Sequence, residues 1–352
     1  MKTDYLNDVQ VIVVGGGHAG CEAALASSRL GARTLLITLA GTEVAAMPCN
    51  PSIGGIAKSH LVFELDALGG EMARNTDYTG VQFRVLNTSR GPAVRSNRAQ
   101  CDKAAYSARM ATVLAGTPNL TTVHAEVSDF LVSGDRIIGI TLEDGTHVKC
   151  QAVVLTPGTF MHGRIHIGDE SYAGGGNKSP SADTMGDSLE RLGFQMARLK
   201  TGTPPRLHKD SIDYSKIQKQ DGVTPPPFFS WEVRRQSKLF HVEQREPLFH
   251  MEQHIVPSLV PWIPGSDQMP CYLTHTTEQT HDIIGRNLKR SALYGGRIAG
   301  TGVRYCPSIE DKIVKFPEKE RQQLFLEPEG IATDEYYVNG FSTSLPLAVQ
   351  IE

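Results

Sequence analysis

Cys49 lies in a short loop whose composition could support thiol chemistry. Pro48 and Pro51 stiffen the backbone around the thiol, and Gly54 and Gly55 follow shortly after. We expect a helix to begin just beyond these glycines. A helix N-terminus lowers the pKa of a nearby thiol because its partial positive charge favours the thiolate. A cysteine packed in the interior is the alternative, but the loop composition favours a reactive Cys49.

Cys306 stands in a second setting of this kind. It follows Arg304 and precedes Pro307, and a charged segment expected to be helical comes next. A neighbouring cation favours the thiolate, and Glu310 and Asp311 in that segment could relay protons. A packed thiol explains the same residues equally well, so the sequence leaves both interpretations of Cys306 open.

Basic residues gather in the stretch 84–103, where the one acid is Asp102. The basic residues are Arg84, Arg90, Arg95, Arg98 and Lys103. A solvated surface explains such a cluster, and so does a site that grips the phosphate groups of a cofactor or of RNA. Arg90, Arg95 and Arg98 are therefore candidate contacts to phosphate or nucleic acid.

The elements that would position these residues begin with an apolar run at 9–14. The run has almost no polar alternation, which indicates a strand buried on both faces of a parallel sheet. Gly15, Gly17 and Gly20 follow it in the pattern Gly-x-Gly-x-x-Gly, at the expected turn into a helix. In this pattern the glycines permit a tight turn, close approach of a pyrophosphate, and close packing of the helix on the strand. The expected dinucleotide contacts are Gly15, Gly16, Gly17, His18, Ala19 and Gly20.

The identity of the dinucleotide depends on the next strand, expected at 32–37. The acidic residue that usually holds the ribose of NAD is missing there, since the first acid beyond this strand is Glu43. Contacts to the ribose would fall to Thr38, Thr42 or backbone groups. This departure argues against NAD at the glycine loop.

A strand-rich stretch at 121–150 favours a flavin instead. It contains an Asp144-Gly145 turn between two strand-like segments, and a further apolar, buried strand is expected at 152–155. Flavoproteins of the glutathione-reductase type interrupt their parallel sheet with such a meander and close it with such a strand. We therefore expect FAD.

The predicted fold is α/β, with a Rossmann-like FAD-binding parallel sheet of the glutathione-reductase type, a β-meander, and a smaller inserted α+β domain. Residues 1–200 would form the first part of the FAD-binding domain. Repeated prolines break any long helix after residue 200, so 201–300 would form the inserted domain on the NADH and substrate side. Residues 301–352 would return to the FAD-binding domain and leave it incomplete, since nothing near Glu352 marks a domain end.

Composition excludes several other classes. The 352 residues include 35 basic and 38 acidic side chains, so any nucleic-acid site must come from local clustering rather than from net charge. We find no signal peptide and no apolar run long enough to span a bilayer, and we expect a cytoplasmic protein. The cysteines show no metal-ligand spacing, so we expect no metal and mostly reduced thiols.

Taken together, the motifs resemble one family: the FAD-dependent tRNA uridine 5-carboxymethylaminomethyl modification enzymes, large subunit, called MnmG or GidA. The resemblance spans essentially the whole chain. The matching stretches are 15–20, 49–55, 66–70, 90–95, 198–206, 305–312, 327–330 and 342–346. The family continues beyond this point with a flavin-contacting strand and a helical C-terminal domain, so we expect the chain to lack that part.

The resemblance implies an enzyme that adds a carboxymethylaminomethyl or aminomethyl group at C5 of the wobble uridine of certain tRNAs. It implies FAD on the glycine loop with a further contact at Val127, and NADH near 302–316 with contacts at Gly302, Val303 and Arg304. It also implies methylenetetrahydrofolate as the one-carbon donor, the GTPase partner MnmE, and a homodimer.

The resemblance also implies roles for the two thiols, because Cys49 and Cys306 occupy the positions of the family's functional cysteines. Reduced FAD would carry the methylene group from folate, one thiol would attack C6 of uridine, and the other would assist proton transfer. The sequence does not assign these two roles.

Two other functions stay open. A folate- and FAD-dependent tRNA uridine methyltransferase would share the cofactors, but it resembles the chain less around Cys306. A truncated, non-catalytic chain that binds RNA or dimerises is the second alternative. Analysis of the modified tRNA separates the first from the expected enzyme, and flavin absorbance separates the second.

Overall fold

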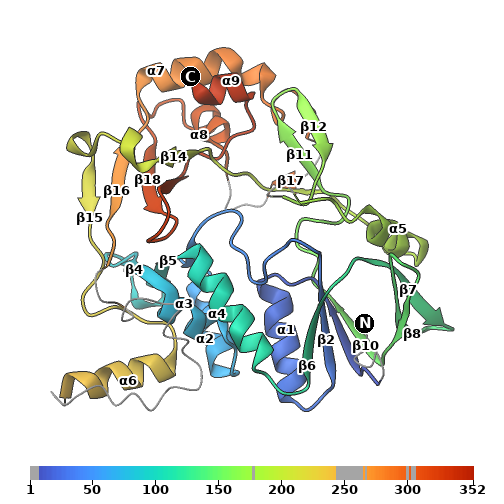
Figure 1. The fold of residues 1–352 in the computed structure, drawn as a ribbon. Coiled ribbons are helices and arrows are strands. Elements are labelled where there is room, and N and C mark those ends of the chain that lie inside the picture. Colours follow the sequence, from blue (N-terminus) through green and yellow to red (C-terminus); the bar gives the residue numbers. More distant parts are fainter. Residues whose placement is uncertain (1–7, 177–178, 243–264, 266–267, 299–300, 303–306) are drawn as a thin grey trace.

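The computed structural model describes residues 8–176, 179–242, 265, 268–298, 301–302 and 307–352. A parallel sheet with strand order β10-β1-β2-β6 forms the part nearest the N-terminus (Figure 1). Its strands are β1 (Val11–Val14), β2 (Thr34–Thr38), β6 (Leu120–His124) and β10 (Ala152–Leu155). Helix α1 (His18–Arg29) connects β1 to β2, and α4 (Lys103–Ala115) leads into β6. The strand–glycine–helix unit expected from the sequence is confirmed.

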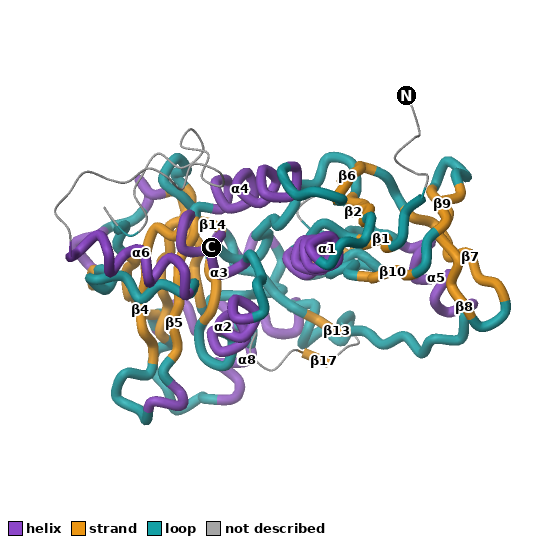
Figure 2. The backbone as a smooth tube through the Cα atoms, turned by 90° about the horizontal axis from the view of Figure 1, so that it is seen from below, coloured by secondary structure: helices purple, strands orange, loops and turns teal. Residues whose placement is uncertain are grey.

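The meander expected from the sequence is also present. Strands β7 (Val127–Ser133), β8 (Arg136–Leu142) and β9 (His147–Lys149) pair antiparallel in sequence order. Figure 2 shows this meander at one end of the molecule, with the parallel sheet beside it. The α/β fold with a parallel sheet and β-meander is therefore confirmed.

The expectation of a fully buried strand at 152–155 is wrong. Strand β10 pairs parallel with β1 but forms the edge of the sheet among the described residues. Ala152 and Val154 are exposed (Val154 37%), whereas Val153 and Leu155 point to the other face and pack on the core that contains the meander.

A small antiparallel sheet stands next to the parallel one. Its order is β3-β5-β4, with β3 (Ser52–Gly54), β5 (Ser96–Cys101) and β4 (Gly80–Leu86). Helices α2 (Ser59–Ala67) and α3 (Met72–Thr79) connect β3 to β4. The helix expected directly after Gly55 thus begins four residues later, at Ser59, because 52–54 pair with β5. Nearness in sequence to a helix N-terminus therefore no longer supports a lowered thiol pKa for Cys49.

A second antiparallel sheet, with order β14-β19-β18-β16-β15, collects distant segments. Its strands are β14 (Arg206–His208), β15 (Gln218–Gln220), β16 (Cys271–His275), β18 (Gln323–Pro328) and β19 (Glu335–Asn339). Strands β18 and β19 belong to the segment expected to return to the FAD-binding domain, and here they pair with β16 and β14. The domain boundaries stay a prediction. Strands from 301–352 and from 201–300 nevertheless share this one sheet.

The remaining described α-helices and strands lie between or after these sheets in the chain. They are β11 (Arg164–Ile167), β12 (Glu170–Ala173), α5 (Asp183–Arg191), β13 (Leu199–Lys200), α6 (Trp231–Val242), α7 (Glu278–Asn287), β17 (Thr301–Gly302), α8 (Ile309–Lys315) and α9 (Leu347–Ile351). None of the helices in the described residues is long and apolar enough to cross a membrane.

Apolar side chains on the two faces of the parallel sheet enter two different cores. Val13 and Leu36 pack with α1 and α4, whereas Ile12 and Leu35 pack with the meander. Successive residues of a strand point to opposite faces, so both cores need an unbroken apolar run. Cys21 is fully buried in the first core, and burial raises the pKa of its thiol to about 12.

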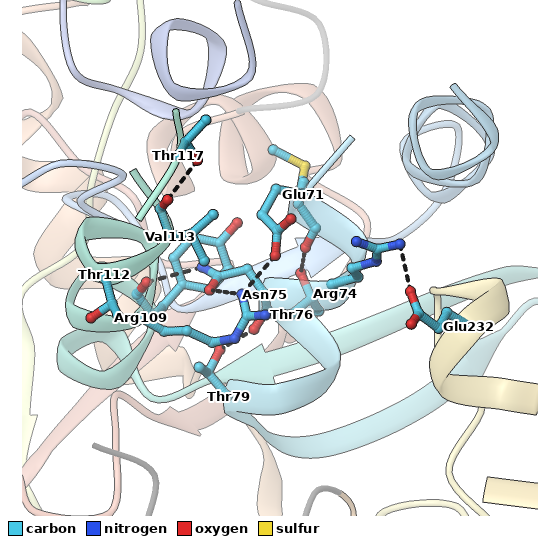
Figure 3. Close-up of polar contacts among 12 residues, drawn as sticks. Glu71, Arg74, Asn75, Thr76, Thr79, Arg109, Thr112, Val113, Thr117 and Glu232 are labelled. Carbon is cyan, nitrogen blue, oxygen red and sulfur yellow. Dashed lines mark hydrogen bonds and ion pairs between the residues drawn. The ribbon is translucent and has the colours of Figure 1, made fainter. Parts of the chain in front are cut away.

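A buried ion pair fixes α3 against α4 (Figure 3). Arg109 donates to Glu71 and to the side-chain oxygen of Asn75, at 2.9 Å each. Glu71 also pairs with Arg29 of α1 at 3.1 Å. Arg109 is 3% exposed, so its charge depends on these partners rather than on water.

Replacing Arg109 should therefore destabilise the fold. Arg109→Ala leaves Glu71 and Asn75 short of a buried donor, and we expect a loss of about 3 kcal/mol of unfolding free energy. Urea denaturation measures it, with Arg136→Ala on the exposed end of β8 as the matched control. A loss as small as that of the control would show that the pair adds no stability.

Candidate functional site

The glycine loop between β1 and α1 leaves no room for a side chain at two of its glycines. Gly15 has φ +106°, and a Cβ there would lie 2.2 Å from the carbonyl oxygen of Thr156. A Cβ on Gly20 would lie 1.7 Å from the carbonyl oxygen of Gly15. A Cβ on Gly17, in contrast, would meet nothing within 4 Å. The turn and the helix packing thus require Gly15 and Gly20, while Gly17 leaves open space beside the helix N-terminus.

This open space fits a phosphate group. Helix α1 begins at His18 with no side-chain cap on its first amides and no acidic residue in its first turn. Such an end stabilises an anion through free N–H groups and the helix dipole. The Nδ1 atom of His18 is buried without a hydrogen-bond partner, and burial lowers the pKa of this histidine. The described residues therefore form a cradle suited to a dinucleotide phosphate.

The residues expected at the ribose end lie at the carboxyl end of β2. The hydroxyls of Thr38 and Thr42 are 3.0 Å apart, and Thr42 also donates to the carbonyl of Leu39 at 2.6 Å. Val127 begins the meander, and its side chain is buried in the core. Any contact of Val127 with a ligand would consequently use its backbone.

The Cys49 loop is held to the second antiparallel sheet by Arg206. One guanidinium nitrogen of Arg206 donates to the carbonyl of Cys49 at 2.5 Å, and the Nε atom donates to Glu329 at 2.8 Å. The guanidinium also lies over the ring of Tyr337, 5.0 Å from its centroid. The half-buried Cys49 thiol lies 3.9 Å from the carbonyl of Gly202. Arg206 therefore fixes the backbone that carries the thiol.

Sequence reasoning missed this role of Arg206. Arg206 lies inside one of the family-like stretches, but its acceptor, the carbonyl of Cys49, is 157 residues away. No pattern in the neighbouring sequence predicts such a distant hydrogen bond. The proline pair that precedes it was the available hint, since it predicts a rigid approach to β14.

The second thiol, Cys306, lies outside the described residues, as do Val303 and Arg304. Gly302 ends β17, which pairs with Lys200 of β13, two residues before Gly202. The segment that leads toward Cys306 thus runs beside the segment that contacts Cys49. The charged helix expected after Cys306 is confirmed as α8, which Ser308 caps by accepting from the Asp311 amide at 3.1 Å. A shared pocket for the two thiols stays a prediction.

The three candidate phosphate-binding arginines have different environments. Arg90 and Arg95 are exposed in the connection between β4 and β5. Arg98 lies in β5 and pairs with the buried Glu327 at 2.6 Å. The Arg98 guanidinium also donates to the hydroxyl of Ser52 at 2.9 Å. A phosphate role for these residues stays a prediction, and the structure gives Arg98 a structural role as well.

The chain matches the family model described as glucose inhibited division protein A over residues 10–247 and 258–352. It belongs to the GidA family. The tRNA uridine 5-carboxymethylaminomethyl modification enzyme MnmG of Lactobacillus delbrueckii subsp. bulgaricus is 47% identical over 352 residues, which are 100% of this chain and 52% of that protein. The family resemblance inferred from the motifs is confirmed.

Two solved structures of Aquifex aeolicus GidA are similar to this GidA family member. The form I crystal structure has a TM-score of 0.84 and 48% identity, covering 98% of this chain and 54% of that chain. The form II crystal structure has a TM-score of 0.82 and 45% identity, covering 97% of this chain and 51% of that chain. The chain spans about half the length of the curated relatives and solved structures that it matches.

The glycine loop of this GidA family member gives a matched pair of variants. Gly17→Val should preserve the fold, because its side chain enters open space, but should lower retention of FAD about tenfold or more by filling the phosphate position. Gly20→Val should lower the melting temperature, because it collides with the backbone of Gly15. Melting curves and flavin absorbance measure both. A folded Gly17→Val protein with full flavin would place the dinucleotide elsewhere.

Arg206 gives a second prediction about the site. Arg206→Gln removes the charged donor on the Cys49 carbonyl, so the loop should open more often and Cys49 should react faster with iodoacetamide. A charged hydrogen bond contributes about 1.5–3 kcal/mol, which corresponds to roughly tenfold or more in rate. Peptide mass spectrometry reports alkylation at Cys49, with the half-buried Cys150 as the internal control. An unchanged rate at Cys49 would exclude the holding role.

Proposed function

We propose that this chain carries the flavin site and a reactive thiol of a tRNA-modifying flavoenzyme that acts at C5 of the wobble uridine. The main support is the Arg206-held Cys49 loop, in a chain that also has an open phosphate cradle at α1. A relative 47% identical over the whole chain is named as a tRNA uridine 5-carboxymethylaminomethyl modification enzyme.

In this proposal FAD binds at the cradle formed by residues 15–20, with its phosphates at the first amides of α1. The bound flavin supplies the redox chemistry. NADH binds near Gly302, Val303 and Arg304 as the reductant, and methylenetetrahydrofolate supplies the one-carbon unit. The GTPase MnmE, a second copy of the chain and a cytoplasmic location complete the proposal.

The protein's own thiols act on the uracil ring. One of the Cys49 and Cys306 thiolates adds to C6, which forms a C–S bond and shifts an electron pair toward C5. C5 then attacks the methylene carbon of the one-carbon unit, which forms a C–C bond and shifts an electron pair to the carrier nitrogen. C5 loses its proton to the other thiol or its base as the C–S bond breaks and the ring is restored. A small amine then displaces the carrier nitrogen and leaves the aminomethyl group on C5. Arg206 fixes the backbone of Cys49 and so orients this thiol.

Serine variants of the two cysteines test the proposal in the whole gene product that contains this chain. Cys49→Ser and Cys306→Ser should each keep FAD and lower uridine modification at least about a hundredfold, because a serine hydroxyl is a poor nucleophile at neutral pH without a dedicated base. Mass spectrometry of tRNA nucleosides measures the product. Cys150→Ser, in the segment between β9 and β10, is the matched control and should stay active.

The same assay separates the alternatives. A product that carries only a methyl group at C5 would assign the methyltransferase function instead. Normal modification by both serine variants would contradict the thiol mechanism. A folded, colourless wild-type protein that does not recover flavin would favour a non-catalytic chain.

A further inference from the structure

A basic pocket of about 660 Å³ lies between the second antiparallel sheet and α8, at some distance along the chain from the glycine loop. Residues from β5, β16, β18, β19, α8 and the segment after α8 line it. They are Arg98, His275, Lys312, Lys319, Arg321, Gln322, Gln323, Phe325, Asn339 and Gly340. Figure 1 shows β16 and β18 side by side below α7 and α8. The volume is in the usual range for a ligand site.

The charge of this pocket is only partly compensated, because among its cations Arg98 pairs with Glu327 at 2.6 Å. No carboxylate is among the described residues that line it, and neither Lys319 nor Arg321 forms an ion pair within the part of the chain that the structure describes. Lys312 donates to the carbonyl of Gly340 at 2.8 Å. Burial, with a smaller contribution from Lys319, lowers the pKa of Lys312. A pocket lined by more cations than carboxylates favours an anionic ligand.

Gln322 provides an independent sign of a missing ligand. Its side chain is 6% exposed, lines the pocket, and leaves Nε2 without a hydrogen-bond partner. The backbone on which it stands is fixed, because the Gln322 amide donates to the Thr276 hydroxyl at 2.8 Å. A buried donor without an acceptor costs free energy, and a ligand oxygen would remove that cost.

The pocket shares one polar network with the Cys49 loop. Glu327 accepts from Arg98 at 2.6 Å and from Asn339 at 2.8 Å, and both donors line the pocket. The other oxygen of Glu327 accepts from the hydroxyl of Ser52 at 3.2 Å, three residues from Cys49. Hydrogen bonds through Glu327 therefore connect the pocket to the loop that carries the Cys49 thiol.

We propose that this pocket binds a backbone phosphate of the tRNA strand next to the nucleotide that reaches Cys49. The proposal rests on the function proposed above and names a contact of its substrate. A nucleotide bound near Cys49 necessarily brings flanking phosphates, and Lys319 and Arg321 offer exposed cations for them. The side chain of Phe325 provides an apolar surface against which a sugar or base packs.

The first test reverses the exposed charges in the whole gene product. The double variant Lys319→Glu and Arg321→Glu should weaken tRNA binding about tenfold or more at low salt, and should reduce the salt dependence of the binding constant by roughly 0.7–0.9 per lost phosphate contact. The control is Arg136→Glu with Lys149→Glu, which makes the same charge change on the exposed meander. Flavin content should stay unchanged in both.

Gln322→Leu is the second variant. It removes an unsatisfied buried donor, so the protein should stay as stable as the wild type in urea while tRNA binding weakens. A stable Gln322→Leu protein with unchanged tRNA binding would contradict the proposal, as would a charge-reversed protein that behaves like its meander control.

A third measurement distinguishes RNA from a small phosphate ligand. If the variants lose affinity for NADH or inorganic pyrophosphate but keep tRNA affinity, the pocket serves a small molecule and the proposal is overturned. Failure of the proposed function itself is recognised separately, because the wild-type protein would then neither bind nor modify tRNA.

Discussion

Glu329 is the group on which the arrangement of the candidate site depends. It is 5% exposed and pairs with Lys103 at 2.9 Å and Arg206 at 2.8 Å. Removing either cation would leave a buried carboxylate undercompensated, at a cost of several kcal/mol. Arg206 donates through Nη2 to the backbone of the Cys49 loop, including the carbonyl of Cys49 itself, and through Nη1 to Thr203 and Pro204. One carboxylate thus links the thiol loop, the start of α4 and the second antiparallel sheet.

Two other buried carboxylates also join donors from distant segments. Glu71 joins Arg29 and Arg109, and Glu327 joins Arg98, Ser52 and Asn339. Each buried carboxylate has donors from segments far apart in the chain. Buried ion pairs add little net stability compared with apolar packing, but an incorrect arrangement would leave charges unpaired. In this chain they fix how the parts meet around the pocket and the thiol loop.

The glycine cradle, in contrast, is shaped by close backbone contacts rather than by ion pairs. A Cβ on Gly15 would collide with Thr156 and a Cβ on Gly20 with Gly15, whereas a Cβ on Gly17 would meet no atom of the described residues within 4 Å. Open space beside a helix N-terminus that has no side-chain cap leaves room for a ligand phosphate. The contrast between Gly17 and Gly20 agrees with the motif, in which one glycine leaves room for a phosphate and the other permits close helix packing.

The sequence by itself determined the β1–α1 unit and the meander, because apolar runs, turn residues and glycine spacing act over short distances. It also determined the family, through motifs spread along the chain. It did not determine that 152–155 would form an exposed edge, that α2 would begin only at Ser59, or that β18 and β19 would join the second sheet. Those outcomes depend on which strand pairs with which, and distant segments compete for that pairing. The bond from Arg206 to Cys49 and the pair of Arg98 with Glu327 span 157 and 229 residues, so only the tertiary structure decided them.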